Sequence, residues 1–184
     1  MYNSEYREYL RRHKRSQNKG AYGKDSEMGK VYKSEWAIAK MMKDKNTSFD
    51  NIRQAQKYVD RITKSKTWQK VRSNRRSNVT LVAMKDQSGG VAATAWGGYI
   101  KIKPGHMEKY VILHELAHEA GHMHHGRSFR QCLLKLVSQF MGRDVAEALK
   151  VQFKKHKLAF GDARSPLTEA QWLKARNRMR SIRG

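Results

Sequence analysis

Residues 110–118 read Tyr-Val-Ile-Leu-His-Glu-Leu-Ala-His, an apolar run that leads into the pattern H-E-x-x-H. The apolar lead-in favours a buried helix, on which positions i and i+4 lie on the same face. His114 and His118 therefore present two imidazoles to one point, with Glu115 beside them. Imidazole nitrogens bind zinc well, and a neighbouring carboxylate can accept a proton from a metal-bound water. We expect a Zn²⁺ site on this helix, with Glu115 as the general base.

A third protein ligand is needed, and the residues after the helix offer His122, His124 and His125. Gly121 can end the helix with a positive φ and turn the chain back toward the metal. With His124 the spacing is H-E-x-x-H-x-x-G-x-x-H, which is similar to that of metzincins. With His125 the chain continues as H-G-x-x-F over residues 125–129, ahead of an apolar stripe at helical spacing. We favour His125 and keep His124 as the alternative, while His122 is expected to lie outside the ligand set.

These segments resemble a family of HExxH metallohydrolases found in actinobacteria and their phages, related to SprT-like metallopeptidases. The similarity covers roughly residues 27–160, and beside the metal motif it is carried by residues 31–36, 55–61, 125–129 and 141–146. The resemblance implies a zinc-dependent hydrolase, and among hydrolases a peptidase, without naming its substrate. It also implies that the histidine at the start of residues 125–129 binds metal and that the aromatic residue at their end anchors the next helix. The extra histidines before this segment depart from the family pattern and leave the third ligand open.

The second large signal is charge, because the chain has 39 Lys and Arg against 16 Asp and Glu, a formal net charge of +23. Residues 61–85 hold eight basic residues and no acid, and residues 1–20 and 162–184 are also basic. Such a surface attracts polyanions through counterion release. We expect nonspecific nucleic-acid binding. Trp68 or Trp172 could add stacking on single strands, although tryptophans at such positions are more often part of the core. The contacts are expected to centre on Arg72, Arg75 and Arg76.

Length and composition bound the remaining possibilities. The chain has 184 residues, which is enough for one domain with a sizeable core, and it has no apolar run of about 18 residues. Its polar first twenty residues do not have the pattern of a secretory signal. The single cysteine, Cys132, falls on an apolar helical face and is expected to be buried. We expect a cytoplasmic protein, in the host cytoplasm or the virion if it is phage-encoded. Its expected partners are a protein or peptide substrate, nucleic acid and other virion proteins, but no membrane.

The patterns predict an α+β fold: a mainly helical, zincin-like domain with a small antiparallel sheet. This domain is expected at residues 25–160, between a basic N-terminal arm at 1–24 and a basic C-terminal helix or tail at 161–184. Capping residues place helix starts at Asp25 or Ser26, at Ser48 and at Asp144. Strands are expected at residues 78–84, 91–96 and 99–103, and the last of these is the candidate edge strand for binding a substrate backbone.

Further roles follow only weakly from the sequence. The candidates for a second stabiliser of the tetrahedral intermediate are Tyr99, His106 and Arg127. The candidates for orienting the ligand imidazoles are Glu119, Asp144 and Glu147. The alternative function is a basic nucleic-acid-binding or virion structural protein whose zinc site only stabilises the fold. A structural site of that kind would be closed by a fourth protein ligand, for which His122 or His124 is available.

Overall fold

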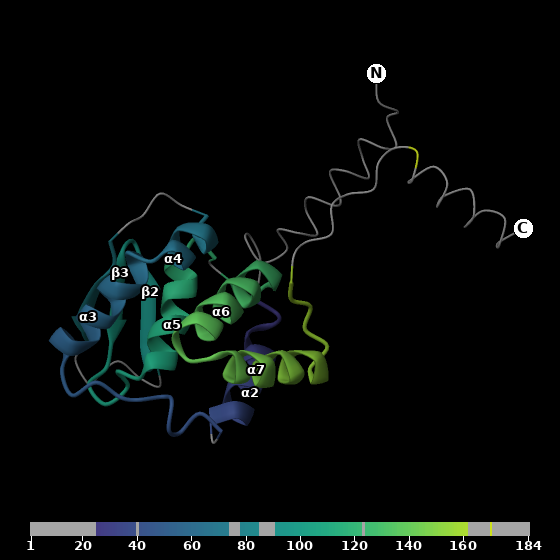
Figure 1. Ribbon diagram of the computed structural model, residues 1–184, viewed down its shortest axis with the longest axis horizontal. Coiled ribbons are helices and arrows are strands. Elements are labelled where there is room, and N and C mark those ends of the chain that lie inside the picture. The colour runs from purple at the N-terminus through teal and green to yellow at the C-terminus, as the bar shows by residue number, and fades with distance from the viewer. Residues whose placement is uncertain are drawn as a thin grey trace, which may run out of the picture.

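The computed structural model describes residues 25–39, 41–73, 78–84, 91–122 and 124–161, together with Ala170. The predicted N-terminal arm, and the C-terminal segment apart from Gly161 and Ala170, lie outside the described residues. Within the described part the fold is α+β, as predicted (Figure 1). Its helices are α2 (Met28–Ala39), α3 (Ile52–Thr63), α4 (Lys66–Val71), α5 (Lys109–Glu119), α6 (Arg127–Phe140) and α7 (Arg143–Lys155). None of these helices has both the length and the apolar character needed to cross a bilayer.

The sheet has three strands, which are β1 (Thr80–Ala83), β2 (Ala93–Trp96) and β3 (Tyr99–Ile102), in the order β1-β3-β2. Strands β2 and β3 form an antiparallel hairpin. Its two-residue loop, Gly97 and Gly98, has φ values of 66° and 93°, which favour glycine. The prediction of an antiparallel sheet is wrong, because β1 runs parallel to β3. Strand β2 lies between them in the sequence, so no hairpin connects β1 to β3.

The prediction that residues 99–103 form an edge strand is wrong, because the sheet order is β1-β3-β2. Strand β3, predicted at residues 99–103, is the central strand and is paired on both sides. The outer edge of β1 is covered by Gln56 of α3, whose Nε2 donates to the Val79 carbonyl at 2.9 Å. The Gln56 Oε1 accepts from the Leu81 amide at 2.7 Å, so one side chain replaces a neighbouring strand. Strand β2 forms the other edge.

The core surrounds α5, which packs against the sheet on one side and against α6 on the other. Ile100 and Ile102 of β3 and Ile112 and Leu116 of α5 are fully buried there. Helix α5 packs against β2 and α6, and α2 packs against α7 (Figure 1). Burial of apolar area on this scale is the main favourable term in folding. The core therefore fixes α5, the helix that carries the motif.

Two buried side chains test expectations from the sequence. Cys132 is 2% exposed, which confirms that it is a buried thiol. Trp68 is fully buried in α4, which agrees with the core position favoured for it and excludes it as a residue that stacks on nucleic-acid bases. The indole instead fills the core beneath the basic stretch, where its large apolar surface stabilises the fold.

The helix starts agree with the predictions in one case out of three. The Oδ1 atom of Asp25 accepts from the Met28 amide at 3.1 Å and caps α2, as expected. Helix α3 is capped by Asn51 rather than Ser48, which instead forms an isolated β-bridge with Glu108. Helix α7 begins after Gly142, without a side-chain cap from Asp144.

Candidate metal centre

Three histidine side chains lie close together and form the candidate metal site. His114 and His118 lie one turn apart on α5, and the chain then turns at Gly121, whose φ is 105°. This turn brings His125 back over the helix, with its ring centroid 5.0 Å from that of His114 and 4.8 Å from that of His118. One ligand atom from each residue lies within 4.8 Å of the others. The three side chains predicted as ligands are thus together, and the cluster could hold a metal ion.

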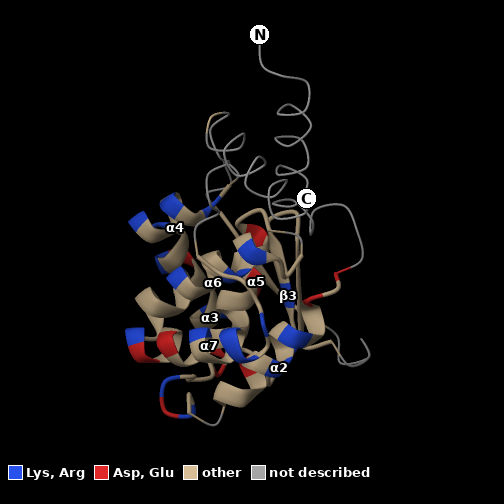
Figure 2. Ribbon diagram, turned by 90° about the vertical axis from the view of Figure 1, so that its right-hand side faces the viewer, with Lys and Arg blue, Asp and Glu red and all other residues tan. Residues whose placement is uncertain are grey.

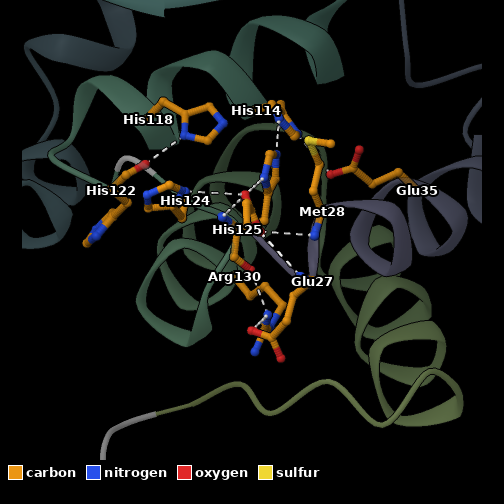
Figure 3. Close-up of polar contacts among 10 residues, drawn as sticks. Glu27, Met28, Glu35, His114, His118, His122, His124, His125 and Arg130 are labelled. Atoms are coloured by element: carbon orange, nitrogen blue, oxygen red, sulfur yellow. Dashed lines mark hydrogen bonds and ion pairs between the residues drawn. The ribbon is translucent and has the colours of Figure 1, made fainter. Parts of the chain in front are cut away.

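The hydrogen bonds of the three rings fix which nitrogen faces the centre. In each ring Nδ1 faces an oxygen acceptor, so a neutral imidazole carries its proton there and leaves Nε2 with a free lone pair. The acceptors of His114, His118 and His125 are Glu35 Oε1 at 2.9 Å, the carbonyl oxygen of His122 at 2.6 Å and Asp25 Oδ2 at 2.6 Å (Figure 3). Partners of this kind fix the tautomer and the ring orientation of histidines that bind metals.

The distance between two of these Nε2 atoms fits a shared cation. His114 Nε2 lies 3.1 Å from His125 Nε2. Without an ion, a protonated His114 can donate from Nε2 to His125 Nε2 at this distance, whereas two imidazoles protonated only on Nδ1 would place their lone pairs face to face. Two nitrogens bound tetrahedrally to zinc at about 2.0–2.1 Å lie about 3.3 Å apart. The cluster therefore has the donor type and the spacing that a first-row metal ion requires.

Electrostatics also disfavour a fully protonated cluster. Burial and the neighbouring His114 lower the pKa of His118 to about 3. Burial likewise lowers the pKa of His125, against the opposing effect of Asp25. Burial opposes protonation of His114 as well, but the Glu35 and Glu115 carboxylates together outweigh burial and raise the pKa of His114. Because the three rings cannot all carry protons together, lone pairs remain available to a cation.

Aromatic rings enclose the cluster. Phe129 is fully buried, and its centroid lies 5.0, 4.5 and 4.8 Å from those of His114, His118 and His125. The sequence predicts Phe129 as an anchor of α6 in the core, and the structure confirms its burial. It also forms the floor of the histidine cluster. Tyr32 of α2 contacts two of the rings, with centroids 5.7 Å from His114 and 5.1 Å from His125.

Arg130 holds the loop that carries His125. Its guanidinium is 1% exposed and donates to the His125 carbonyl at 2.6 Å and to Glu27 Oε2 at 2.9 Å (Figure 3). Its Nε also donates to the Ala159 carbonyl at 2.8 Å. The buried guanidinium of Arg130 on α6 therefore connects the residue before α2 and the segment after α7 to the histidine loop. A buried charge is tolerated only when it is paired and hydrogen-bonded in this way.

The sequence analysis did not assign three residues to the site, which are Asp25, Glu35 and Arg130. The sequence pattern around two of them could have identified them. Glu35 shares a helical face with Val31 and Ile38, both fully buried, and a carboxylate on such a face requires a partner. Arg130 stands in the same relation to the buried Leu133 and Val137 of α6. Asp25 was identified only as a helix cap, and its second role depends on the fold.

The Nδ1 atoms of the three histidines face acceptors other than the suggested orienting carboxylates, although one of these carboxylates, Glu119, lines the same cleft. Glu119 accepts from the Gly98 amide at 3.0 Å, Asp144 pairs with Lys45, and Glu147 pairs with Lys150. The residues suggested as a second stabiliser do not line the cleft at the histidines. Tyr99 lies on the sheet, His106 is exposed in a loop, and the Nε of Arg127 donates to the Gly161 carbonyl.

A cleft of about 630 Å³ opens beside the histidine cluster. One wall is α2, with Met28 and Tyr32, and the facing wall is the edge strand β2. Glu115 lines the cleft and is 8% exposed, and burial raises its pKa to about 6. His118 and His125 also line it, so the histidine cluster is open on this side. The described lining residues include no Lys or Arg, in contrast to the charge of the whole chain.

Two other predicted elements of the site remain as expectations. His124 also lines the cleft, but it is not part of the three-histidine cluster, and its Nδ1 lies 3.8 Å from Asp25 Oδ2. Arg72 ends α4, while Arg75 and Arg76 lie outside the described residues. The nucleic-acid contacts predicted for these arginines therefore stay a prediction.

No family model, curated protein or solved structure matches this chain. The resemblance to HExxH metallohydrolases therefore stays an expectation from the sequence. The fold and the site define the protein as an α+β protein with a buried three-histidine cluster that could hold a metal ion.

Proposed function

We propose that the protein is a zinc-dependent metallohydrolase, and specifically a peptidase. The observation that carries this proposal is the convergence of the Nε2 atoms of His114, His118 and His125 beside Glu115 at an open cleft. Each imidazole has its Nδ1 proton accepted by an oxygen, so the donor set is arranged before any ion binds. Three nitrogen donors with one open side suit a catalytic zinc site.

The histidines and Glu115 have separate roles in the proposed reaction. His114, His118 and His125 would hold the ion. When bound, zinc polarises a substrate carbonyl and lowers the pKa of a coordinated water. Glu115 is the base in the same cleft, and burial raises its pKa to about 6. A carboxyl group titrating near neutrality can accept a proton from the attacking water and return it to the leaving amine.

Tyr32 supplies a hydrogen-bond donor at the cleft. Burial, with the nearby Glu35 and Glu115 carboxylates, raises its pKa to about 12, so the phenol keeps its proton. It replaces Tyr99, His106 and Arg127 as the candidate for stabilising the developing oxyanion. Donors placed where charge develops contribute strongly to catalysis in enclosed sites.

The edge strand β2 favours a peptide substrate. Lys103 donates to the Ala92 carbonyl, and pairing alternates along the hairpin, so Ala93 and Ala95 direct their backbone groups away from β3. These residues line the cleft, and an extended peptide can add there as a fourth strand. The apolar side chains of Met28 and Trp96 on the two walls can contact the side chains of such a peptide.

The arrangement argues against a purely structural zinc site. Among the described residues, the candidate metal-binding group contains only three side chains, and neither His122 nor His124 completes it. The carbonyl of His122 is occupied by His118, and His124 faces Asp25. A structural site would have a fourth protein ligand and would have no use for a buried base such as Glu115.

The test compares Glu115→Gln with the wild type and with Glu147→Gln, a matched substitution on the exposed face of α7. Each protein is loaded with zinc and incubated with a mixture of unfolded proteins, and the new termini are identified by mass spectrometry. We expect wild type and Glu147→Gln to cleave. Glu115→Gln should retain one zinc per chain and lose at least about 100-fold in rate, because the amide cannot accept the proton. Cleavage by Glu115→Gln at the wild-type rate, or a wild-type protein that binds no zinc, would refute the proposal.

A further inference from the structure

The outer face of the sheet carries large apolar side chains that no described element covers. Strand residues alternate between faces, and Leu81, Ile100 and Ile102 are directed into the core. The opposite face presents Trp96, Tyr99 and Val82, which are 76%, 54% and 38% exposed. Contiguous apolar groups on a surface mark interaction sites more often than isolated ones do. This outer face is therefore a candidate binding surface.

The register brings the two aromatic residues together. Trp96 pairs directly with Tyr99 across the β2–β3 hairpin, and Thr80 of β1 pairs with Tyr99 on its other side. Directly paired residues project to the same face with Cβ atoms about 5 Å apart. The hairpin loop ends in glycines, and a Cβ added at Gly97 would meet nothing within 4 Å. The aromatic pair is therefore accessible from the loop end as well as from above.

Basic residues accompany the aromatic pair. Lys101 follows Tyr99 by two positions on β3, so it lies on the same face, opposite Thr94 and Val82. The three strands contain no Asp or Glu. The Thr80 amide donates to the Gly98 carbonyl at 2.8 Å, so β1 lies beside the aromatic pair. In the sequence, β1 belongs to the acid-free stretch of residues 61–85. Figure 2 shows Lys and Arg on β3 and on α4, the helix within this stretch.

We propose that this outer sheet face binds single-stranded nucleic acid. Bases would stack on Trp96 and Tyr99, while Lys101 neutralises a phosphate beside them. Exposed aromatic side chains on a sheet, flanked by cations, suit bases that are free to unstack. The bases of a duplex are already stacked on each other and offer no free face. Charge complementarity favours this partner over a protein, because the strands of this face carry Lys101 and no Asp or Glu, and the whole chain has a net charge of +23.

The proposal goes beyond the hydrolase and does not depend on it. Trp96 belongs to this face and also reaches the cleft, whereas Tyr99 does not line the cleft. A strand bound on the outer face would run beside the cleft, with β2 between them. Protein segments associated with nucleic acid would then be presented to the proposed peptidase. Binding should persist in Glu115→Gln and after removal of metal.

The experiment measures binding of the full chain to fluorescein-labelled oligo(dT) of about 15 nucleotides, at about 0.2 M salt to weaken the contribution of the terminal arms. Trp96→Ala and Tyr99→Ala should each weaken binding by at least about fivefold, the lower limit for losing one stacked base. Trp36→Ala is the matched control, because Trp36 is 77% exposed and belongs to α2, not to the sheet. It should bind as the wild type does.

Three further measurements distinguish base stacking on the sheet from other causes of weaker binding. The conservative variant Trp96→Phe should retain binding within about threefold, because a smaller ring still stacks. Binding of oligo(dT) should quench tryptophan fluorescence in wild type and Trp36→Ala, and much less in Trp96→Ala. Lys101→Gln should reduce the slope of log affinity against log salt by about 0.7. Circular dichroism checks that each variant is folded.

Several results would overturn the proposal. Wild-type affinity in both Trp96→Ala and Tyr99→Ala would exclude stacking on this face. An equal loss in Trp36→Ala, or an equal loss for a duplex of the same length, would show that the effect is not base stacking at the sheet. Failure of the wild type to bind oligo(dT) under these conditions would contradict the proposal and would favour a protein as the partner of this face.

Discussion

Replacing Glu35 by glutamine should weaken zinc binding by about 10- to 100-fold. Glu35 Oε1 lies 2.9 Å from His114 Nδ1, and an ion held about 2 Å beyond Nε2 would lie roughly 7 Å from this carboxylate. At an effective dielectric constant of about 20, a divalent ion and a single negative charge attract by roughly 5 kcal/mol at that distance. The loss should be smaller, about 1.4–2.7 kcal/mol, because the amide carbonyl can still accept the Nδ1 proton and orient the ring.

The assay is competition for zinc between the protein and a chromophoric chelator, read by absorbance. Glu147→Gln is the control, because the same chemical change is made on α7, where Glu147 pairs with Lys150. It should bind zinc as the wild type does. An affinity of Glu35→Gln within twofold of the wild type would refute the reasoning that this carboxylate tunes the metal site. An equal loss in Glu147→Gln would attribute the effect to net charge alone.

Four other predictions concern single side chains. His125→Ala should abolish stoichiometric zinc binding, whereas His124→Ala should not, as measured by metal content after dialysis. The opposite result would identify His124 as the third ligand, with the metzincin-like spacing. Tyr32→Phe should keep zinc and lower kcat by about 100-fold, and an unchanged kcat would remove its role as oxyanion donor. Phe129→Ala should lower the free energy of unfolding by about 3–5 kcal/mol in urea titration, and a loss below 1 kcal/mol would contradict its place in the core. Burial raises the pKa of Cys132 to about 12, so its thiol should not react with a thiol reagent at about pH 8 until the protein unfolds. Rapid labelling of Cys132 in the native protein would contradict this prediction.

The histidine cluster was predictable from the sequence because its geometry is largely local. His114 and His118 are one helical turn apart, and the turn at Gly121 limits where the following histidines can lie. The offset from His125 to Phe129 then distinguishes the favoured spacing from the alternative. Helices and strands with clear apolar periodicity were predictable for the same reason.

The contacts that orient the cluster were not predictable, because they join segments far apart in the chain. Asp25 and His125 are 100 positions apart, and Glu35 and His114 are 79 apart. The parallel pairing of β1 with β3 was also missed, since short strands carry no signal for their partner or direction. Gln56 shows the same limit, because its side chain covers a sheet edge only after α3 has packed against β1.

The central claim is an open zinc centre made by three histidines, and a crystal structure of the zinc-loaded protein with anomalous data at the zinc edge tests it most directly. We predict one ion per chain, bound by Nε2 of His114, His118 and His125 at about 2.0–2.1 Å, with a solvent oxygen facing Glu115 in the fourth position. A fourth protein ligand, or an anomalous peak away from these three residues, would contradict the account.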